Sequence, residues 1–483
     1  MSDIAFNPAH RLAGMIRSRE IGCLELLNHY LARIERFNPA LNAIIWMDVE
    51  GAKARAAKAD TALAKGEMWG PLHGLPMTIK ESFDLLGSPT TWGIPAMRNN
   101  ISHSNSVAAQ RLLNAGAVIF GKTNVPLLLA DWQSFNEIYG TTNNPWDLTK
   151  TPGGSSGGSS AALAAGLTAL ELGSDIGASI RNPAHYCGVM GHKPTWGIVP
   201  PRGQTVAASL AQSDISVSGP LARTVEDLAL ALGTLAGPDT LDEAGWRLVL
   251  PKPKKTKLAD YRIAVMARDP NCAVDEEYAE RIIALGRALE KAGAKVSYDA
   301  RPAIDMRRSH QIYIKLLRGV TTARLAPDIF ADWQRKAAAL SPKDESYRAQ
   351  VTRAAVMLHR DWLAAHEERT KMRWAWHDFF KEWDVLLTPA AAGPAWPHDQ
   401  KGERIDRKII VNGKPEDTND QLFWAGISGI VLLPSTVTPL GLNKAGLPLG
   451  VQIIGDHLQD LTTIETARLV VEQIGGFVPP PGY

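Results

Sequence analysis

Residues 151–170 read Thr-Pro-Gly-Gly-Ser-Ser-Gly-Gly-Ser-Ser, followed by Ala-Ala-Leu-Ala-Ala-Gly-Leu-Thr-Ala-Leu. A run of glycine and serine by itself is typical of a flexible linker. The second half of the stretch argues against a linker, because its apolar residues are good helix formers that belong in a buried helix. We therefore predict a glycine-rich turn that opens a buried helix over 160–170 and presents free backbone N–H groups, which suit oxyanion binding.

Two further segments carry candidate reactive groups. Residues 73–80 read His-Gly-Leu-Pro-Met-Thr-Ile-Lys, and residues 174–181 read Ser-Asp-Ile-Gly-Ala-Ser-Ile-Arg. With the glycine/serine run, these segments resemble the amidase signature family, whose enzymes hydrolyse amides with a serine, a second serine and a lysine. The spacing matches the family pattern, because Ser155 lies 75 positions after Lys80 and Ser179 lies 24 positions after Ser155.

The resemblance covers nearly the whole chain and implies the fold class α/β, an α/β/α sandwich in which helices flank a central mixed β-sheet. It further implies a single amidase domain over residues 1–483. Within that domain we expect N-terminal helices (1–70), a signature core with the catalytic residues (75–240) and a variable, mainly helical substrate-side region (300–420). A chain of 483 residues with 45% hydrophobic content can bury a core of this size.

Ser179 is the expected nucleophile, and it needs a base because a serine hydroxyl is too weakly acidic to attack an amide unaided. The resemblance implies that Ser155 relays the proton between Ser179 and Lys80, and that Ser155 is held in a cis peptide. Lys80 acts as general base only when neutral, whereas free lysine has a pKa of about 10.4. The largely apolar residues 75–79 favour a buried amine with a lowered pKa.

A structural role for Lys80 is supported equally well by spacing alone. In that interpretation, the buried amine forms an ion pair with Glu81, Asp84 or Asp175.

The backbone N–H groups of Ile176, Gly177, Ala178 and Ser179 are the expected oxyanion donors, and losing one such donor typically costs ~3–4 kcal/mol of barrier. Many family members carry two glycines before the nucleophile, whereas this chain has Gly177-Ala178. A positive φ at Ala178 would cost about 1–2 kcal/mol.

Three neighbouring residues are expected to support the catalytic groups. Asp175 and Arg181 flank the nucleophile and would fix its loop through charge-assisted hydrogen bonds. Ser156 is either a hydrogen-bond relay or simply a small residue that fits.

Two motifs suggest other chemistry but lack its context. Residues 116–123 match the G-x-x-x-x-G-K-[ST] phosphate loop, yet the intervening Ala-Val-Ile-Phe reads as a strand, and a phosphate cradle needs a loop. His185, Cys187 and His192 lack the usual spacings of zinc ligands, so we expect packing residues and no metal.

Other segments predict the remaining elements. We expect helices from about residue 9 to 65 with Pro39 separating two of them, and a strand over 118–120. A β-α-β unit is expected over 262–266, 276–292 and 294–297. Two buried strands are expected within 383–389 and 446–455, both of which resemble family segments. The helical stretch 303–383 is rich in tryptophan, and its indoles either pack helices together or line a substrate pocket: Trp333, Trp362, Trp374, Trp376 and Trp383.

Composition limits the partners. The net charge of +2 gives no reason to expect nucleic acid or an anionic membrane as a partner. Three scattered cysteines indicate free thiols in a reducing compartment, and no signal peptide or long apolar stretch is evident, so we expect a cytoplasmic protein. The oligomeric state is not encoded in any visible pattern, and a homodimer is the default for assemblies.

The expected function is hydrolysis of a non-peptide carboxylic acid amide, with an aryl or medium-chain acyl group, without a cofactor. Cleavage of esters or carbamates by the same site is a second expectation, because the acyl-enzyme route does not require an amine leaving group. A third is a glutaminase-type amidotransferase subunit that works with other proteins in tRNA amidation. Leu127 disfavours it, because family members acting on tRNA-linked glutamate often carry Glu there. Glu81 also departs from the Asp that is common after the lysine. A binding protein with a degenerate site is the non-enzymatic alternative.

Overall fold

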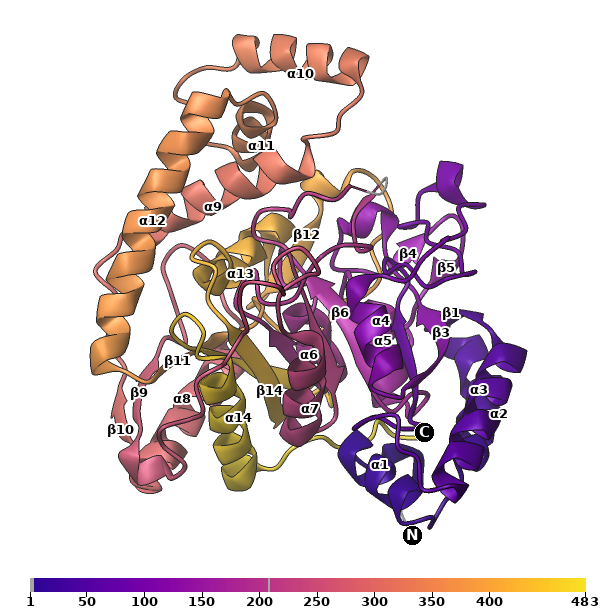
Figure 1. Cartoon of the computed structure of the whole chain (residues 1–483). Coiled ribbons are helices and arrows are strands. Elements are labelled where there is room, and N and C mark those ends of the chain that lie inside the picture. The colour runs from indigo at the N-terminus through magenta and orange to yellow at the C-terminus, as the bar shows by residue number, and fades with distance from the viewer. Residues whose placement is uncertain (1–3, 207–208) are drawn as a thin grey trace.

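The computed structural model describes residues 4–206 and 209–483. Eleven strands of these residues form one sheet, in the order β1-β3-β2-β6-β8-β7-β14-β15-β11-β9-β10. Some neighbours are parallel and others antiparallel, and helices pack against the sheet (Figure 1). The predicted α/β fold with a mixed central sheet is therefore confirmed, while the assignment of the whole chain to one domain stays a prediction.

The N-terminal part is helical, with one strand inserted. Its elements are α1 (Ala9–Arg17), α2 (Cys23–Leu41), β1 (Ile44–Met47) and α3 (Val49–Ala64). The prediction that Pro39 separates two helices is wrong, because Pro39 lies in the last turn of α2. The helix ends instead at Asn42, which adopts a left-handed conformation with φ +50°.

The strands that carry the signature segments lie together in one half of the sheet. They are β2 (Pro76–Lys80), β3 (Val118–Thr123), β6 (Glu171–Asp175), β8 (Val217–Ala222) and β7 (Met190–Lys193). Strand β2 is parallel to both β3 and β6. The carboxyl ends of β2 and β6 therefore meet at one edge of the sheet, and this edge carries Lys80 and Asp175.

The other half of the sheet contains the later strands, of which four match the predicted segments. It consists of β14 (Ser435–Leu442), β15 (Pro448–Ile454), β11 (Val385–Pro389), β9 (Arg262–Val265) and β10 (Lys295–Ser297). Strands β9 and β10 are parallel and are joined through α8 (Glu276–Lys291), which confirms the β-α-β unit.

Helices cover both faces of the sheet. On one side, α5 (Gly157–Ala164) and α6 (Arg181–Cys187) pack against each other and against the strands, and on the other side α7 (Val225–Leu235) and α14 (Asp460–Ile474) do the same. Helix α5 is shorter than the predicted 160–170. It ends because Gly166 adopts φ +66° and the Leu167 N–H turns back to the Ala162 carbonyl.

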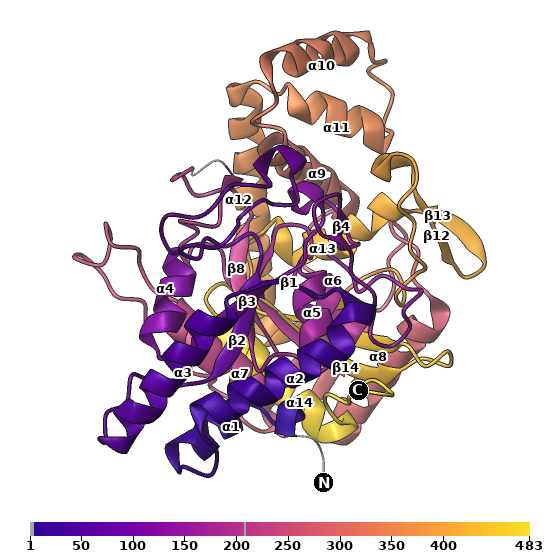
Figure 2. The same ribbon diagram turned by 90° about the vertical axis from the view of Figure 1, so that its right-hand side faces the viewer.

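A group of helices projects beyond one end of the sheet. It contains α9 (Met306–Thr321), α10 (Pro327–Ala339), α11 (Tyr347–Ala355) and α12 (His359–Glu382), which Figures 1 and 2 both place at the top of the molecule. Helix α10 has no buried residue, whereas α9 packs on α13 (Leu422–Gly429).

The predicted packing role of the tryptophans holds for Trp376, which is fully buried, but not for Trp374, which is 65% exposed. The described chain also contains shorter elements, among them α4 (Val107–Asn114), β4 (Phe135–Asn136), β5 (Gly140–Thr141), β12 (Lys408–Val411) and β13 (Lys414–Asp417).

Candidate active site

Lys80 is the last residue of β2, and its side chain is completely buried. Its Nζ lies 2.7 Å from Ser155 Oγ and 2.9 Å from Ser174 Oγ, with the Ser174 carbonyl oxygen at 3.4 Å. Burial lowers the pKa of Lys80 to about 7, although the negative charges of Asp175 and Glu81 oppose that shift. A substantial fraction of this amine is therefore neutral near neutral pH.

The three carboxylates that could have paired with Lys80 bind other groups. Glu81 accepts the backbone N–H groups of Thr91 and Trp92. Asp84 accepts the Ser102 hydroxyl at 2.8 Å. Asp175 accepts hydrogen bonds from Arg181. The expectation of a structural ion pair is therefore wrong, because the Lys80 amine contacts the Ser155 and Ser174 hydroxyls and the Ser174 carbonyl oxygen instead of a carboxylate.

The glycine-rich turn brings Ser155 to Lys80 through close backbone contacts. The Gly154–Ser155 peptide is cis, as the family resemblance implied. A Cβ on Gly154 would lie 2.3 Å from the Asp131 carbonyl oxygen, and a Cβ on Gly158 would lie 2.3 Å from the Asn124 nitrogen. Only glycine permits these approaches, so the turn is a packed structure and the linker interpretation is excluded.

Ser156 connects the turn to the segment that carries Ser179. Its N–H donates to the Ser179 carbonyl at 3.1 Å, and its hydroxyl donates to the Ser174 carbonyl at 3.3 Å. The structure thus brings the segments of Ser155 and Ser179 side by side, although they are separated in sequence.

Asp175 and Arg181 form hydrogen bonds that fix the loop carrying Ser179. The Arg181 guanidinium donates to both Asp175 oxygens, at 2.8 and 3.0 Å, and the Ile180 N–H adds a further bond at 3.0 Å. Burial opposes ionisation of Asp175, but the Arg181 charge and these hydrogen bonds lower its pKa to about 2. The loop is therefore held by an ionised pair that is almost entirely buried.

The four predicted oxyanion donors differ in whether the backbone N–H group already has an acceptor. The Ala178 N–H donates to Asp175 Oδ1 at 3.0 Å, so the prediction that it is free for an oxyanion is wrong. Ala178 adopts φ +71°, the conformation that glycine favours, and this turns its N–H toward the carboxylate. Over residues 4–206 and 209–483, the N–H groups of Ile176, Gly177 and Ser179 have no protein acceptor.

Two polar residues were not anticipated from sequence: Ser174, which contacts Lys80, and Gln204, which contacts Ser174. Ser174 lies in the quoted signature segment, but its pattern gave no reason to assign it a role. Its hydroxyl also receives a hydrogen bond from Gln204 Nε2 at 3.2 Å. Gln204 carries no sequence signal, because it is 124 residues from Lys80 in a loop without a recognisable motif.

The phosphate-loop motif and the histidines of the possible zinc site belong to regular structure and core packing. Gly121, Lys122 and Thr123 belong to strand β3, so the phosphate-loop pattern lacks its loop. His185 and His192 bind backbone and side-chain partners within the core, and no cluster of potential metal ligands occurs among the described residues.

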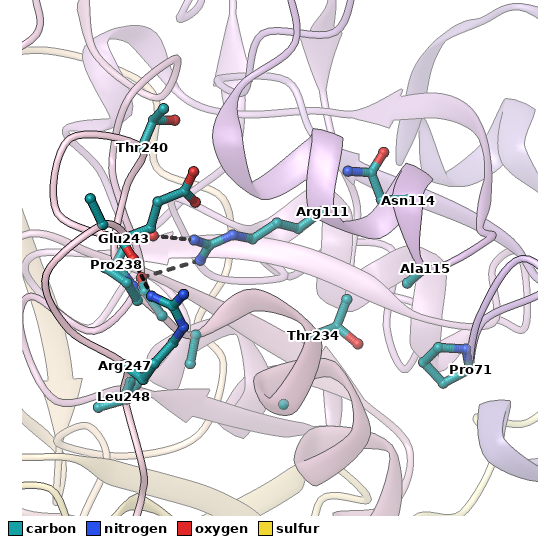
Figure 3. Close-up of a pocket in the computed structure, with 14 residues that line it drawn as sticks. Pro71, Arg111, Asn114, Ala115, Thr234, Pro238, Thr240, Glu243, Arg247 and Leu248 are labelled. Carbon is teal, nitrogen blue, oxygen red and sulfur yellow. Dashed lines mark hydrogen bonds between the residues drawn. The ribbon is translucent and has the colours of Figure 1, made fainter.

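A surface pocket of about 920 Å³ lies apart from these groups, between the C-terminal ends of α4 and α7 (Figure 3). Arg111 spans it and donates to the Pro238 carbonyl at 2.6 Å. Its lining includes none of the predicted catalytic residues, so we do not assign the amide chemistry to it.

The chain belongs to the amidase family, whose model matches residues 25–464. As a member of this family, it is a hydrolase acting on C–N bonds. It is 32% identical to an indoleacetamide hydrolase from Bradyrhizobium diazoefficiens, over 96% of this chain and 86% of that protein. It is 31% identical to a glutamyl-tRNA(Gln) amidotransferase subunit from a Picosynechococcus species, over 94% of this chain and 95% of that one.

A solved structure of a bacterial aryl acylamidase of the amidase signature family superimposes with a TM-score of 0.82 and 24% identity, covering 99% of both chains. This likeness confirms the fold. Among the residues described, no helix has both the length and the apolar character required to cross a membrane.

Proposed function

We propose that this protein hydrolyses amides of aryl or medium-chain carboxylic acids through an acyl-enzyme on Ser179, with Ser155 as proton relay and Lys80 as general base. The observation that carries the proposal is the contact between the buried Lys80 amine, whose pKa is about 7, and the Ser155 hydroxyl at 2.7 Å. A serine nucleophile needs a neighbouring group that is neutral at working pH and can accept a proton.

In the first half of the reaction, Ser179 Oγ attacks the amide carbonyl carbon. The Ser179 proton passes to Ser155 Oγ while the Ser155 proton passes to Lys80 Nζ. The oxygen of the tetrahedral intermediate accepts hydrogen bonds from the free N–H groups of Ile176, Gly177 and Ser179. The proton then returns through Ser155 to the leaving nitrogen, the C–N bond breaks, and ammonia or an amine departs.

In the second half, water replaces the amine. Its proton follows the same route to Lys80 as its oxygen attacks the acyl carbon. Collapse of the second intermediate returns the proton to Ser179 and releases the carboxylic acid. The leaving group takes part only when its bond to the acyl carbon breaks. The same site therefore suits esters and carbamates as well as amides.

An aromatic acyl group is favoured by the relative named as an indoleacetamide hydrolase, which aligns over nearly the whole chain. The test is a panel of aryl, aliphatic, indole-bearing and carbamate substrates, with product release and acylated protein mass followed together. Turnover and acylation should vanish in Ser179→Ala. Ser160→Ala is the matched control, because Ser160 is a buried serine of the same run whose hydroxyl has no partner in the described structure. Equal loss in both variants, or acylation that persists without Ser179, would reject the proposal.

A second candidate is the ammonia-producing component of an amidotransferase, which the relative of that name favours. Leu127, which is 47% exposed, argues against this second function, because family members that act on tRNA-linked glutamate often carry Glu at this position. Purification from the native host with a tightly bound smaller partner, together with glutamine as the preferred substrate, would favour this second function.

A further inference from the structure

The loop that precedes the nucleophile is held by two aromatic side chains from distant parts of the chain. The Tyr313 hydroxyl, on α9, donates to the Ile176 carbonyl at 2.8 Å. Trp132 Nε1 donates to the next carbonyl, that of Gly177, also at 2.8 Å. Two consecutive peptide groups are therefore each fixed by a side-chain donor.

These two peptides differ in what their N–H groups do. The Gly177–Ala178 peptide, held by Trp132, has its N–H committed to Asp175. The Ile176–Gly177 peptide, held by Tyr313, has an N–H without a protein acceptor in the described structure. In a trans peptide the carbonyl and the N–H point in opposite directions, so whatever fixes the Ile176 carbonyl also aims the Gly177 N–H.

The Tyr313 ring is closely packed against α13. It is completely buried, and it lies over two glycines of α13. A Cβ on Gly426 would come within 2.6 Å of Tyr313 Cδ1, and a Cβ on Gly429 within 3.3 Å of Cε2. The absence of side chains at both positions lets the ring lie against the helix, which leaves the hydroxyl little freedom to move.

We propose that Tyr313 is a positioning residue for the oxyanion site, holding the Ile176–Gly177 peptide so that the Gly177 N–H faces the reacting carbonyl. The inference rests on the proposed function. It adds that α9, the first helix of the projecting group in Figure 1, is in direct contact with the catalytic loop.

The test compares Tyr313→Phe with Tyr30→Phe. Tyr30 is the matched control, because it is also fully buried and its hydroxyl donates to a backbone carbonyl, that of Ala5, at 3.1 Å. Steady-state kinetics on the best amide of the panel would be combined with the rate of Ser179 phosphonylation by an alkyl fluorophosphonate, whose phosphoryl oxygen enters the same N–H site.

We expect Tyr313→Phe to lower kcat and the phosphonylation rate by about 10- to 100-fold, less than the loss typical of deleting a donor outright. KM should change by less than about twofold, and the pH midpoint should stay at its wild-type value, because the Lys80 environment is untouched. Tyr30→Phe should keep the wild-type kcat, whatever its effect on thermal stability.

A Tyr313→Phe protein with wild-type kcat would overturn the inference while leaving the proposed function intact. So would a loss of kcat shared by Tyr30→Phe or accompanied by a shifted pH midpoint. A wild-type protein that is neither acylated nor phosphonylated would overturn the proposed function and this inference together.

A second variant covers the case in which Tyr313→Phe does not fold. Gly429→Ala displaces the ring by a few tenths of an ångström and keeps the hydroxyl, whereas Gly233→Ala adds the same methyl group on α7 with nothing within 4 Å. A lower kcat in Gly429→Ala than in Gly233→Ala supports the inference, and equal kcat values contradict it.

Discussion

Lys80 and Lys122 lie on adjacent strands, β2 and β3, and both are completely buried. Burial lowers the pKa of each, to about 7 for Lys80 and about 8 for Lys122. Their partners differ. The Lys122 amine donates to the carbonyl oxygens of Glu81 and Pro89, at 3.2 and 2.6 Å, and to the Thr90 hydroxyl at 2.8 Å. Backbone carbonyl oxygens can only accept hydrogen bonds, so the surroundings of Lys122 favour a protonated amine.

The nearest partners of Lys80 are the hydroxyls of Ser155 and Ser174. A hydroxyl can accept from an ammonium or donate to the lone pair of a neutral amine, so the contact survives a change of protonation. The comparison teaches that burial alone does not make a lysine a base. The partners must tolerate both of its forms.

The largest expected effect is the difference between Lys80→Met and Lys122→Met. Lys80→Met should lower kcat by about 1,000-fold or more at neutral pH, because the proton acceptor is gone. Lys122→Met should keep kcat per folded molecule but lower the free energy of unfolding by about 1–3 kcal/mol for each buried carbonyl left unpaired. Steady-state kinetics and urea unfolding measure the two effects separately. A comparable loss of kcat in both variants would break the distinction.

Buried carboxyl groups show the same contrast. Asp175 has fixed cationic and N–H partners and stays ionised, with a pKa of about 2. Glu171, at the start of the same strand β6, is fully buried among hydroxyls, including that of Thr78. Burial raises the pKa of Glu171 to about 8, although the hydrogen bonds from Thr78, Ser159 and Thr123 oppose the shift.

Asp175→Asn should lower the free energy of unfolding by about 3–5 kcal/mol, because the buried Arg181 charge loses its counter-ion. Asp239→Asn is the control. Asp239 pairs with Arg202 at 2.6 Å, but at the surface, so its loss should cost about 1 kcal/mol or less. Guanidinium unfolding of both variants measures the difference, and a similar cost at the two positions would show that Asp175 does not hold the loop.

The pH dependence of kcat/KM should follow Lys80. Below its pKa of about 7 the amine is protonated and cannot accept the Ser155 proton, so the rate should fall about tenfold per pH unit. Above that value the rate should reach a plateau. Initial rates between pH 5 and 9 on an amide without ionisable groups measure the profile. A flat profile across neutral pH would mean that neutral Lys80 is not the base.

Candidate residues and elements could be predicted from the sequence where their pattern is local. The glycine/serine run, Lys80 and the Ser179 segment each carry a recognisable pattern, and the strand over 118–120 could be predicted from its apolar residues, although β3 extends to Thr123. The ion-pair alternative for Lys80 could not be settled in that way, because it depends on which donors reach Glu81 and Asp84 in space.

The roles that depend on the folded structure could not be predicted from sequence patterns. Tyr313 meets the Ile176 carbonyl across 137 positions of sequence, and Gln204 reaches Ser174 from a loop without a motif. The positive φ of Ala178, which diverts its N–H to Asp175, is a property of the folded loop. Sequence patterns report periodicity and residue type, whereas these roles depend on which peptide faces which side chain.

The last expected effect is that of Glu171→Gln, and it tests whether burial keeps Glu171 neutral although its hydroxyl partners oppose that. Its pKa rises from 4.5 to about 8 on folding, so between these values the unfolded chain is ionised while the folded protein is protonated. The free energy of unfolding of the wild type should therefore decrease as pH rises through this window, by up to about 1.4 kcal/mol per pH unit from this group. Glutamine cannot ionise, so Glu171→Gln should remove that slope and match the wild type most closely near pH 4.5. Urea unfolding at pH 5, 6, 7 and 8 measures the slopes, and equal slopes for the two proteins would show that Glu171 is ionised in the fold.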